Sequence, residues 1–232
     1  WVDHSNDSEY AEQCHALCAT YSDAAALRIT LLVPTANEGY GAGHNRAMAE
    51  VDSRYHLILN PDVELATDAL SLALDVLATR ENIVLLAPTG FGSSGKPEFL
   101  AKAYPSVWVL GLRAFAPRWL PLKCSRALAR YEMRDQSYDE PLRPIALASG
   151  CCMWVRRAAF DQVTGFDEAY FLYFEDYDLS RKMAEQGAVM EHRDIHIIHH
   201  GGDASRKGLR HVLWFIMGAA RFFRRWGWRW FG

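Results

Sequence analysis

A short apolar segment that ends in an abrupt polar turn constrains this chain most. Residues 55–59 are rich in strand formers, and Asn60, Pro61 and Asp62 follow them directly. Proline cannot donate to a central ladder and biases the residue before it away from the helical region, so the strand has to end here. We therefore expect a carboxylate at the carboxyl end of a buried strand, the edge where ligands bind in open α/β sheets.

Asn60 and Asp62 carry oxygen ligands of the type that suits a hard divalent cation. Mg²⁺ and Mn²⁺ prefer oxygen donors and often take only one or two protein carboxylates together with phosphate oxygens. The turn thus predicts a site for a divalent cation that arrives with a diphosphate. The alternative is an ordinary turn without a ligand, because Asn, Pro and Asp are all common turn formers.

The composition indicates a globular chain with a large core. Of its 232 residues, 50% are hydrophobic and 12% aromatic, and the chain shows no internal repeat, low-complexity tract or charged linker. We expect one catalytic domain over residues 1–205 and a separate tail over residues 206–232. The five cysteines are odd in number and form no CxxC pair, so a reducing, cytoplasmic compartment fits best.

The basic residues are concentrated at the C-terminal end. The net charge is −3, yet the chain from Ala204 onward has seven basic residues and no acidic one. Basic and aromatic residues alternate there, as in helices that lie in the headgroup region of an anionic membrane. The alternative is that the rings pack on the catalytic domain or in a homodimer interface. The aromatic residues in question are Trp214, Phe215, Phe222, Phe223, Trp226, Trp228, Trp230 and Phe231.

Other partners and a membrane span are not predicted. The longest uncharged stretch near the C-terminal end, residues 211–220, is too short to cross a bilayer. The chain also has a net negative charge, and we predict no nucleic-acid partner.

Strands and helices alternate along the first half of the chain. The patterns predict strands at residues 28–33, 55–59 and 83–87, and helices at residues 9–21, 44–51 and 67–80. This alternation is typical of an α/β protein with a mostly parallel central sheet and helices on both faces. Residues 88–144 form an irregular insert with one helix near residues 125–134. Such an insert is either a binding region or a decorated edge of the domain.

A glycine-rich turn is predicted at residues 37–43, before the helix at residues 44–51. Glycine allows backbone N–H groups to approach a ligand closely, and the start of a helix favours an anion. The turn could therefore contact phosphate or sugar. A single GxG is a weak signal, however, and most glycine turns only reverse the chain.

An acidic and aromatic stretch occupies residues 165–179. Glu175, Asp176 and Asp178 begin a helix that we expect to run to Gln186, and its dipole stabilises their ionised forms. Burial among aromatic rings raises the pKa of a carboxyl, whereas the helix end and a metal lower it; this balance is how a general base is tuned. The alternative is that the acids cap the helix and pair with nearby cations, namely Arg181 and Lys182.

The final strand pattern ends in two histidines. Residues 188–200 predict a closing pair of strands, and His199 and His200 are followed by Gly201 and Gly202. Neutral imidazole is a good transition-metal ligand, and glycine leaves room for a ligand to approach. We therefore expect a metal-binding histidine at this strand end.

Six motifs in the same order resemble the family 2 glycosyltransferases of GT-A fold, and in particular the bacterial rhamnosyltransferase-like branch that builds cell-surface polysaccharide. They extend over nearly the whole chain. The resemblance implies an α/β, Rossmann-like fold with helices on both faces of the sheet. The motifs lie at residues 1–5 (WVDHS), 41–47 (GAGHNRA), 59–63 (LNPDV), 165–168 (GFDE), 173–179 (YFEDYDL) and 199–202 (HHGG).

The resemblance assigns residues to the nucleotide-sugar donor. It implies that Asp3 contacts the nucleobase or ribose and that Gly43 and Asn45 belong to the donor-binding loop. Asn60 and Asp62 then flank the metal and the diphosphate, with Mg²⁺ or Mn²⁺ as the cation. The family's pattern normally begins with one more strand and helix that help to hold the nucleotide, and this sequence does not show them. It is therefore expected to be a fragment or to lack part of the donor pocket.

The resemblance also assigns the acceptor side. Gly150 and Glu175 would line it, Asp176 would be the general base, and His199 a second metal ligand. The implied reaction is a single displacement that inverts the anomeric carbon. The implied acceptor is a glycan or a polyprenyl-linked sugar, with the enzyme at the inner face of the cell membrane. A degenerate domain that binds a partner without turnover is the alternative.

Overall fold

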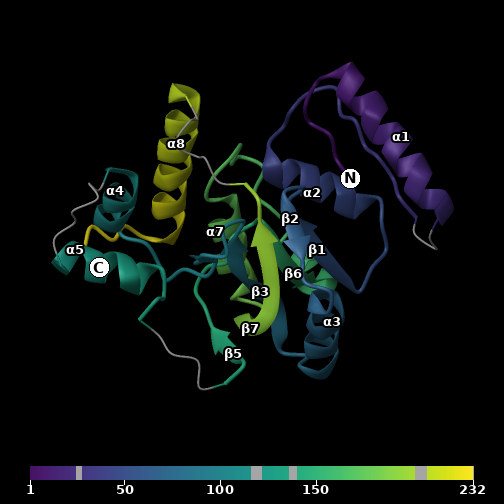
Figure 1. Cartoon of the computed structure of the whole chain (residues 1–232). Coiled ribbons are helices and arrows are strands. Elements are labelled where there is room, and N and C mark those ends of the chain that lie inside the picture. Colours follow the sequence, from purple (N-terminus) through teal and green to yellow (C-terminus); the bar gives the residue numbers. More distant parts are fainter. Residues whose placement is uncertain (25–27, 116–121, 136–139, 202–207, 232) are drawn as a thin grey trace.

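The structure is a computed structural model that describes residues 1–24, 28–115, 122–135, 140–201 and 208–231. An open β-sheet with helices on both faces forms its centre (Figure 1). The strands follow the order β1-β6-β3-β7-β2, with β4 paired to β3 and β5 paired to β7. The strands are β1 (Tyr55–Leu59), β2 (Val63–Leu65), β3 (Ile83–Gly92), β4 (Pro97–Glu98), β5 (Leu142–Pro144), β6 (Cys152–Arg156) and β7 (Ala188–His199).

The α/β class with helices on both faces is confirmed, but the sheet is mixed and not mostly parallel. Among the strands of the described residues, only β3 and β7 pair in parallel, and the other ladders are antiparallel. Hydrophobic patterns carry no information about strand direction, and the short strands β2, β4 and β5 arise in segments that read as turns or as the irregular insert. One further parallel bridge joins Val2 to Leu32.

The sequence predicts β1 correctly and β7 only in part. β1 ends where expected, and the Asn60 N–H donates to the Cys151 carbonyl across 2.8 Å. Residues 188–199, expected to be two strands, form the single strand β7 instead. Its pairing with β3 shifts register between Pro88 and Thr89. One strand with an irregularity therefore lies where two strands were expected.

Alternating side chains of the strands pack against different helices. Ile58, Leu85 and Met153 face one core with α2, α6 and α7, whereas their neighbours Leu86 and Trp154 face a second core with α3. The sheet is therefore covered on both sides, which fixes the strand ends that carry the site. The helices are α1 (Ser8–Ala24), α2 (Tyr40–Ala49), α3 (Ala69–Thr79), α4 (Val107–Phe115), α5 (Leu122–Tyr131), α6 (Arg157–Gln162), α7 (Glu175–Met183) and α8 (Leu209–Trp226).

The predicted glycine-rich turn is mostly helix. α2 begins at Tyr40, so Gly41 and Gly43 lie inside its first turn, and only Gly39 has a left-handed backbone, with φ of 103°. The two helical glycines allow close packing: a Cβ at Gly41 would come 2.7 Å from the Phe166 Cβ. Tertiary contact, which the sequence does not display, thus overrides the poor helix propensity of glycine.

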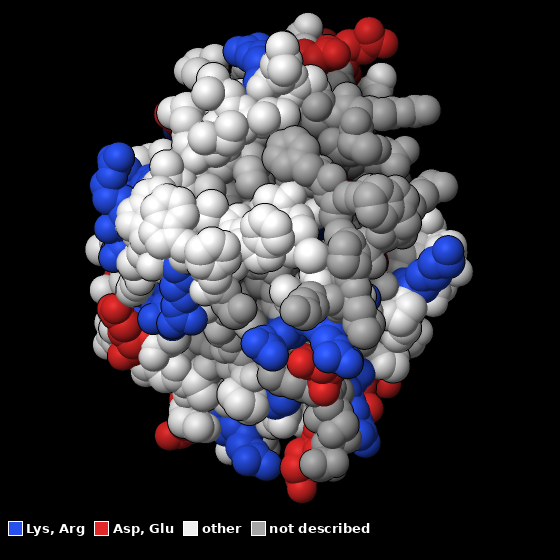
Figure 2. Space-filling model, turned by 90° about the vertical axis from the view of Figure 1, so that its left-hand side faces the viewer, with Lys and Arg blue, Asp and Glu red and all other residues white. Residues whose placement is uncertain are grey.

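α8 packs on the body of the molecule together with α4, α5 and α7 (Figure 1). Phe222 and Phe223 are fully buried there, against Phe174 and Tyr177. These two rings, which the sequence analysis placed at a membrane surface, are therefore core residues, as its alternative proposed. Figure 2 views the molecule from the left-hand side of Figure 1 and shows charged side chains at the top, at the left edge and in the lower half of this face, with an uncharged white area between them. Over the described residues, no helix combines the length and apolarity needed to cross a membrane.

Candidate active site

The two predicted metal ligands lie together at one edge of the sheet. Asp62 follows β1, and β2 carries the chain alongside β7, so that Val63 pairs with His199. The His200 N–H donates to the Asp62 carbonyl across 2.7 Å and holds the two segments together. As a result, the His199 Nε2 lies 3.6 Å from the Asp62 Oδ2.

This edge fits a divalent cation carried by a diphosphate. Asn60 Oδ1 and Asp62 Oδ1 are buried and accept no hydrogen bond from the described residues, which is costly unless a ligand supplies a partner. A Cβ at Gly201 would collide with the Asp62 carboxylate, so glycine keeps this space open. Within the described part of the chain, no three His, Cys, Asp or Glu side chains could enclose a metal by themselves. Phosphate oxygens would therefore have to complete the coordination, as is usual for Mg²⁺.

Glu98 supports this edge and was missed by the sequence analysis. Its Oε2 lies 2.9 Å from the His199 Nδ1. A carboxylate that accepts the Nδ1 proton fixes the ring and leaves Nε2 as the free ligand, here facing Asp62. Glu98 belongs to no motif, and only the pairing of β4 with β3 brings it to His199. No signal in the sequence could have found it.

We call the sheet edge with Asn60, Asp62 and His199 the metal edge. A cavity of about 880 Å³ lies beside it. Its wall includes two of the predicted donor residues, Gly43 on α2 and Asn60 after β1. Asp3 lies next in the chain to the lining residues Val2 and His4, and it is buried. The Ser5 N–H donates to the Asp3 Oδ1 across 2.8 Å, and the Asp3 Oδ2 has no hydrogen-bond partner among the described residues.

Four histidines line the same cavity, and the sequence analysis assigned none of them a role: His4, His44, His56 and His211. Burial lowers the pKa of His44 to about 3 and that of His56 to about 4. These two rings are therefore neutral at pH 7. The Nε2 atoms of His4 and His56 are buried and have no hydrogen-bond partner in the part of the chain that the structure describes, so each is available to a polar group of a ligand.

Asn45 does not line the cavity. Its amide nitrogen donates to the Phe166 carbonyl and to Glu168, and its Oδ1 accepts from the Phe166 N–H, each at 2.9 to 3.0 Å. The side chain therefore fastens α2 to the loop that precedes α7. Its contact with a donor stays a prediction.

The predicted general base is held by backbone groups. Asp176, in the first turn of α7, accepts the Gly150 N–H at its Oδ2 across 2.9 Å and the Tyr177 N–H at its Oδ1 across 2.8 Å. A Cβ at Gly150 would come 3.2 Å from the Asp176 Cβ, so glycine allows this close approach. The Tyr40 hydroxyl donates to the Gly150 carbonyl across 2.6 Å. Tyr40 is thus a second supporting residue that sequence reasoning missed.

The backbone before α7 is strained. Tyr173 and Phe174 have φ of 73° and 68°, in the left-handed region that costs energy for a residue with a side chain. The Phe174 ring is buried against Phe215 and Phe222 of α8, with ring centroids 5.1 and 5.8 Å apart. Packing by α8 therefore holds the conformation that presents Glu175 and Asp176.

The two neighbouring carboxyls have different surroundings. Burial, opposed by the backbone hydrogen bonds, raises the pKa of Asp176. Burial and the nearby Asp176 raise the pKa of Glu175 to about 8, and no described residue forms a hydrogen bond with the Glu175 Oε2. Asp176 is thus the carboxyl whose ionised form is hydrogen-bonded, whereas Glu175 holds its proton at neutral pH. This difference favours Asp176 as the proton acceptor.

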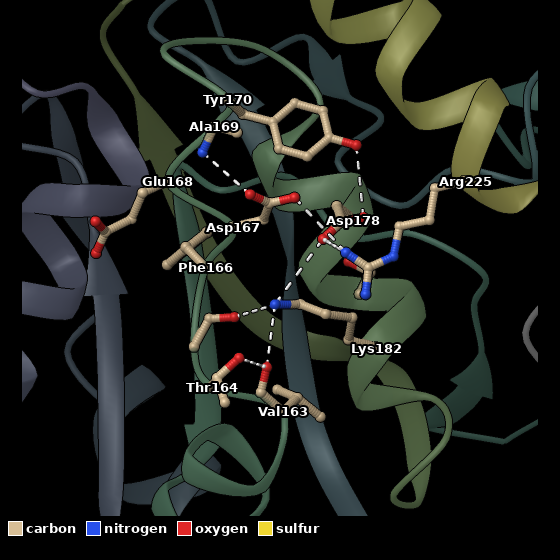
Figure 3. Close-up of polar contacts among 12 residues, drawn as sticks. Val163, Thr164, Phe166, Asp167, Glu168, Ala169, Tyr170, Asp178, Lys182 and Arg225 are labelled. Carbon is tan, nitrogen blue, oxygen red and sulfur yellow. Dashed lines mark hydrogen bonds and ion pairs between the residues drawn. The ribbon is translucent and has the colours of Figure 1, made fainter.

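Asp178, the third acid of α7, is structural. It is fully buried, and the Trp226 Nε1 donates to its Oδ1 across 2.8 Å. Arg225 approaches its Oδ2 at 3.4 Å and Lys182 at 3.9 Å, as Figure 3 shows for the two cations. The expected alternative of helix-cation pairing therefore holds for Asp178, which fastens α7 to α8.

The arrangement is an open α/β domain with the predicted metal ligands at one sheet edge, a cavity beside them and the predicted base in a buried position. The model of the glycosyl transferase family 2 matches residues 5–164, which is more than half of the chain. The chain therefore belongs to this family, as its motifs predict.

Two curated relatives have names that state an activity. The chain is 30% identical over 182 residues to the N-acetylglucosaminyl-diphospho-decaprenol L-rhamnosyltransferase of Mycobacterium tuberculosis, covering 73% of this chain and 58% of the relative. It is 23% identical over 181 residues to the low-salt glycan biosynthesis hexosyltransferase Agl10 of Haloferax volcanii, covering 76% of this chain and 50% of the relative. The chain thus spans little more than half the length of these relatives.

Solved structures share the fold. GalNAc-T7 with UDP, GalNAc and Mn²⁺ superposes with a TM-score of 0.67 at 12% identity, covering 97% of this chain and 41% of that one. The mannosyltransferase PcManGT from Pyrobaculum calidifontis, in complex with GDP-Man and Mn²⁺, has a TM-score of 0.62 at 14% identity, covering 96% of this chain and 54% of that one. At these identities the likeness shows the GT-A fold alone.

Proposed function

We propose that this chain is the catalytic part of a metal-dependent inverting glycosyltransferase. It would move a sugar from a nucleoside-diphosphate donor to a hydroxyl of an acceptor. The observation that carries the proposal is the segment formed by Gly150 and Cys151. The Gly150 N–H binds the carboxylate of Asp176, and the next residue, Cys151, accepts the N–H of Asn60. One dipeptide thus fixes the base relative to the metal edge.

The residues suit the two demands of the reaction. Asp62, His199 and Asn60 would hold the cation and the diphosphate, and the bound cation would neutralise the charge on the departing group. Asp176 would take the proton of the attacking hydroxyl, and its two backbone hydrogen bonds keep its oxygens in place. Attack from the side opposite to the leaving group inverts the anomeric carbon.

We infer a lipid-linked or glycan acceptor in cell-surface polysaccharide synthesis. The support is the name of the mycobacterial relative, which specifies a diphospho-decaprenol acceptor and rhamnose. Rhamnose is accordingly the first sugar to test. An acceptor with a polyprenyl chain would require the enzyme to work at the cytoplasmic face of the membrane.

Metal-dependent donor binding tests the proposal. The melting temperature of the full chain is measured with a panel of nucleotide-sugars, each with Mn²⁺ and with EDTA. Separate, unheated samples are assayed for release of the nucleoside diphosphate. We expect one donor to raise the melting temperature only when Mn²⁺ is present. Protection by no donor would reject the proposal. Protection without turnover on any lipid-linked or glycan acceptor would favour the degenerate binding module.

A further inference from the structure

The outward face of α8 exposes a stripe of apolar side chains. The residues lie three or four positions apart and therefore share one side of the helix. Each is at least 46% exposed, and Leu209 reaches 88%. We call these residues the α8 stripe: Leu209, Val212, Leu213, Ile216 and Met217. A stripe of this size on a helix that is packed on its other side marks an interaction surface.

The stripe belongs to a fixed helix. On the opposite side of α8, Phe222 is fully buried. Arg221 and Arg225 pair with Asp167 at 2.7 and 3.6 Å, and Figure 3 shows Arg225 reaching Asp167 and Asp178. These contacts hold α8 in one orientation, so that the stripe faces outward.

The charges around the stripe match an anionic surface. Arg210 and Arg224 are exposed, and no acidic residue occurs from Ala204 to the end of the sequence. Apolar side chains with arginines at their border are typical of helices that lie in a membrane interface.

The same charges oppose pairing of two copies through the stripe. An antiparallel pair of α8 helices centred on Met217 would place Arg210 of one copy against Arg224 of the other. A parallel pair would place like arginines side by side. Either arrangement brings uncompensated charges together at the border of an apolar contact, which is unfavourable.

The stripe lies next to the acceptor side of the site. Trp214 packs on Phe171 with ring centroids 4.5 Å apart, and His211 Nδ1 lies 3.0 Å from the Tyr173 hydroxyl. Phe171 and Tyr173 belong to the loop that leads directly into Glu175. A surface that touched the stripe would therefore lie close to the acceptor carboxyls.

We propose that the α8 stripe inserts into the boundary between headgroups and acyl chains of an anionic membrane, with Arg210 and Arg224 on lipid phosphates. This surface differs from the one expected from the sequence, because the bound face is aliphatic and Phe222 and Phe223 are buried. The proposal depends on the proposed function in one respect only: membrane binding would give the enzyme access to a lipid-linked acceptor. Its test measures binding without turnover, so the two can fail separately.

Co-sedimentation of the full chain with vesicles tests the stripe. The vesicles contain phosphatidylcholine with or without phosphatidylglycerol. We expect binding that needs the anionic lipid, and at least about tenfold weaker binding for the double variant Leu213→Gln/Met217→Gln. The matched control is Leu70→Gln/Leu74→Gln, which removes two exposed leucines at the same spacing on α3 and should bind like the unaltered chain.

The arginines are tested in the same assay. Arg210→Gln and Arg224→Gln should each weaken binding to anionic vesicles about fivefold at low salt, whereas Arg80→Gln, an exposed arginine beyond α3, should not. Equal binding to neutral and anionic vesicles, or equal loss in the α3 control, would overturn the proposal. The proposal would also be overturned if the chain bound no vesicles and sedimented as a dimer that the Leu213→Gln/Met217→Gln variant abolishes. If a variant melts early, the lipid and salt dependence of the unaltered chain decides alone.

Discussion

The metal edge and the base side of the site are built in opposite ways. At the metal edge, Asn60 and Asp62 each have a buried side-chain oxygen that no described residue contacts by a hydrogen bond. On the base side, both oxygens of Asp176 accept backbone hydrogen bonds. The metal edge therefore offers acceptor atoms to a ligand, whereas the Asp176 carboxylate is already oriented by the backbone. A cation with its diphosphate can be recognised by the groups it satisfies, but a base has to be oriented before the acceptor arrives.

The metal edge and the base side also differ in the groups that orient their key side chains. His199 at the metal edge depends on one side chain, Glu98, for its orientation. Asp176 depends on the backbone of Gly150, which is itself held by Tyr40. Side-chain substitutions should therefore affect the two halves differently: ligand binding for the metal edge, and turnover for the base side.

The largest effect is expected from Asp62→Ala. This change removes the carboxylate from the metal edge, so metal-dependent binding of a nucleoside diphosphate should be abolished. Calorimetric titration with Mn²⁺ and the diphosphate measures it. Glu64→Ala is the matched control, since Glu64 lies two residues away, is exposed and pairs only with His200 among the described residues. Undiminished affinity in Asp62→Ala would show that the metal edge is misassigned.

Asp176→Asn should separate the base side from the metal edge. Asparagine keeps the size of the side chain but cannot take a proton, so turnover should fall roughly a hundredfold or more with donor affinity nearly unchanged. Steady-state rates and donor titration on the same preparation give both values. If Glu175→Gln were the crippling change and Asp176→Asn the mild one, the base would be Glu175.

Glu98→Gln should weaken the metal edge by a smaller amount. Loss of the carboxylate that holds His199 Nδ1 typically lowers metal affinity by about tenfold or more. Mn²⁺ affinity is measured by electron paramagnetic resonance, without any turnover. Donor-independent properties such as the melting temperature of the metal-free chain should change little, because the Glu98 side chain is one-third exposed. Unchanged Mn²⁺ affinity would make Glu98 a purely structural residue.

The sequence predicts the parts of the site that depend on the local sequence pattern. The strand at residues 55–59 and its stop at Pro61 follow from local propensity, and so does the helix that begins at Glu175. Six motifs in register are enough to identify the family. The pairing of Asp62 with His199 was predicted through the resemblance and not through spacing, because 137 positions separate them in the chain.

The remaining features depend on tertiary contacts that no local pattern carries. Glu98 reaches His199 only through a two-strand pairing within the irregular insert. Tyr40 was placed in a turn, yet it begins α2 and reaches Gly150, 110 residues away. The burial of Phe222 likewise depends on α4, α5 and α7, whereas the sequence shows only that α8 is amphipathic. The prediction of a mostly parallel sheet was wrong for the same reason, because strand direction depends on tertiary pairing.

The smallest effect concerns the protonated neighbour of the base. Burial raises the pKa of Glu175 from 4.5 to about 8, so between these values the folded chain holds a proton that the unfolded chain has lost. The free energy of unfolding should therefore fall as pH rises through this window. Buried His44 and His56, with pKa values lowered from 6.5 to about 3 and about 4, act in the opposite sense below pH 6.5. The two histidines add nothing above pH 6.5, so the carboxyl is tested between pH 6.5 and 8. Comparison with a Glu175 variant removes the share of Lys102, whose pKa burial lowers to about 8.

Glu175→Gln should flatten this dependence, because glutamine is neutral at every pH and occupies the same space. Urea unfolding at several pH values between 6.5 and 8 measures the slope for the variant and for the unaltered chain. Glu185→Gln, an exposed change just beyond α7, should leave the slope as it is. Parallel profiles for Glu175→Gln and the unaltered chain would mean that Glu175 is ionised in the folded state. In that case the base side would hold two charged carboxylates and would need a cation of its own, and the contrast with the metal edge would disappear.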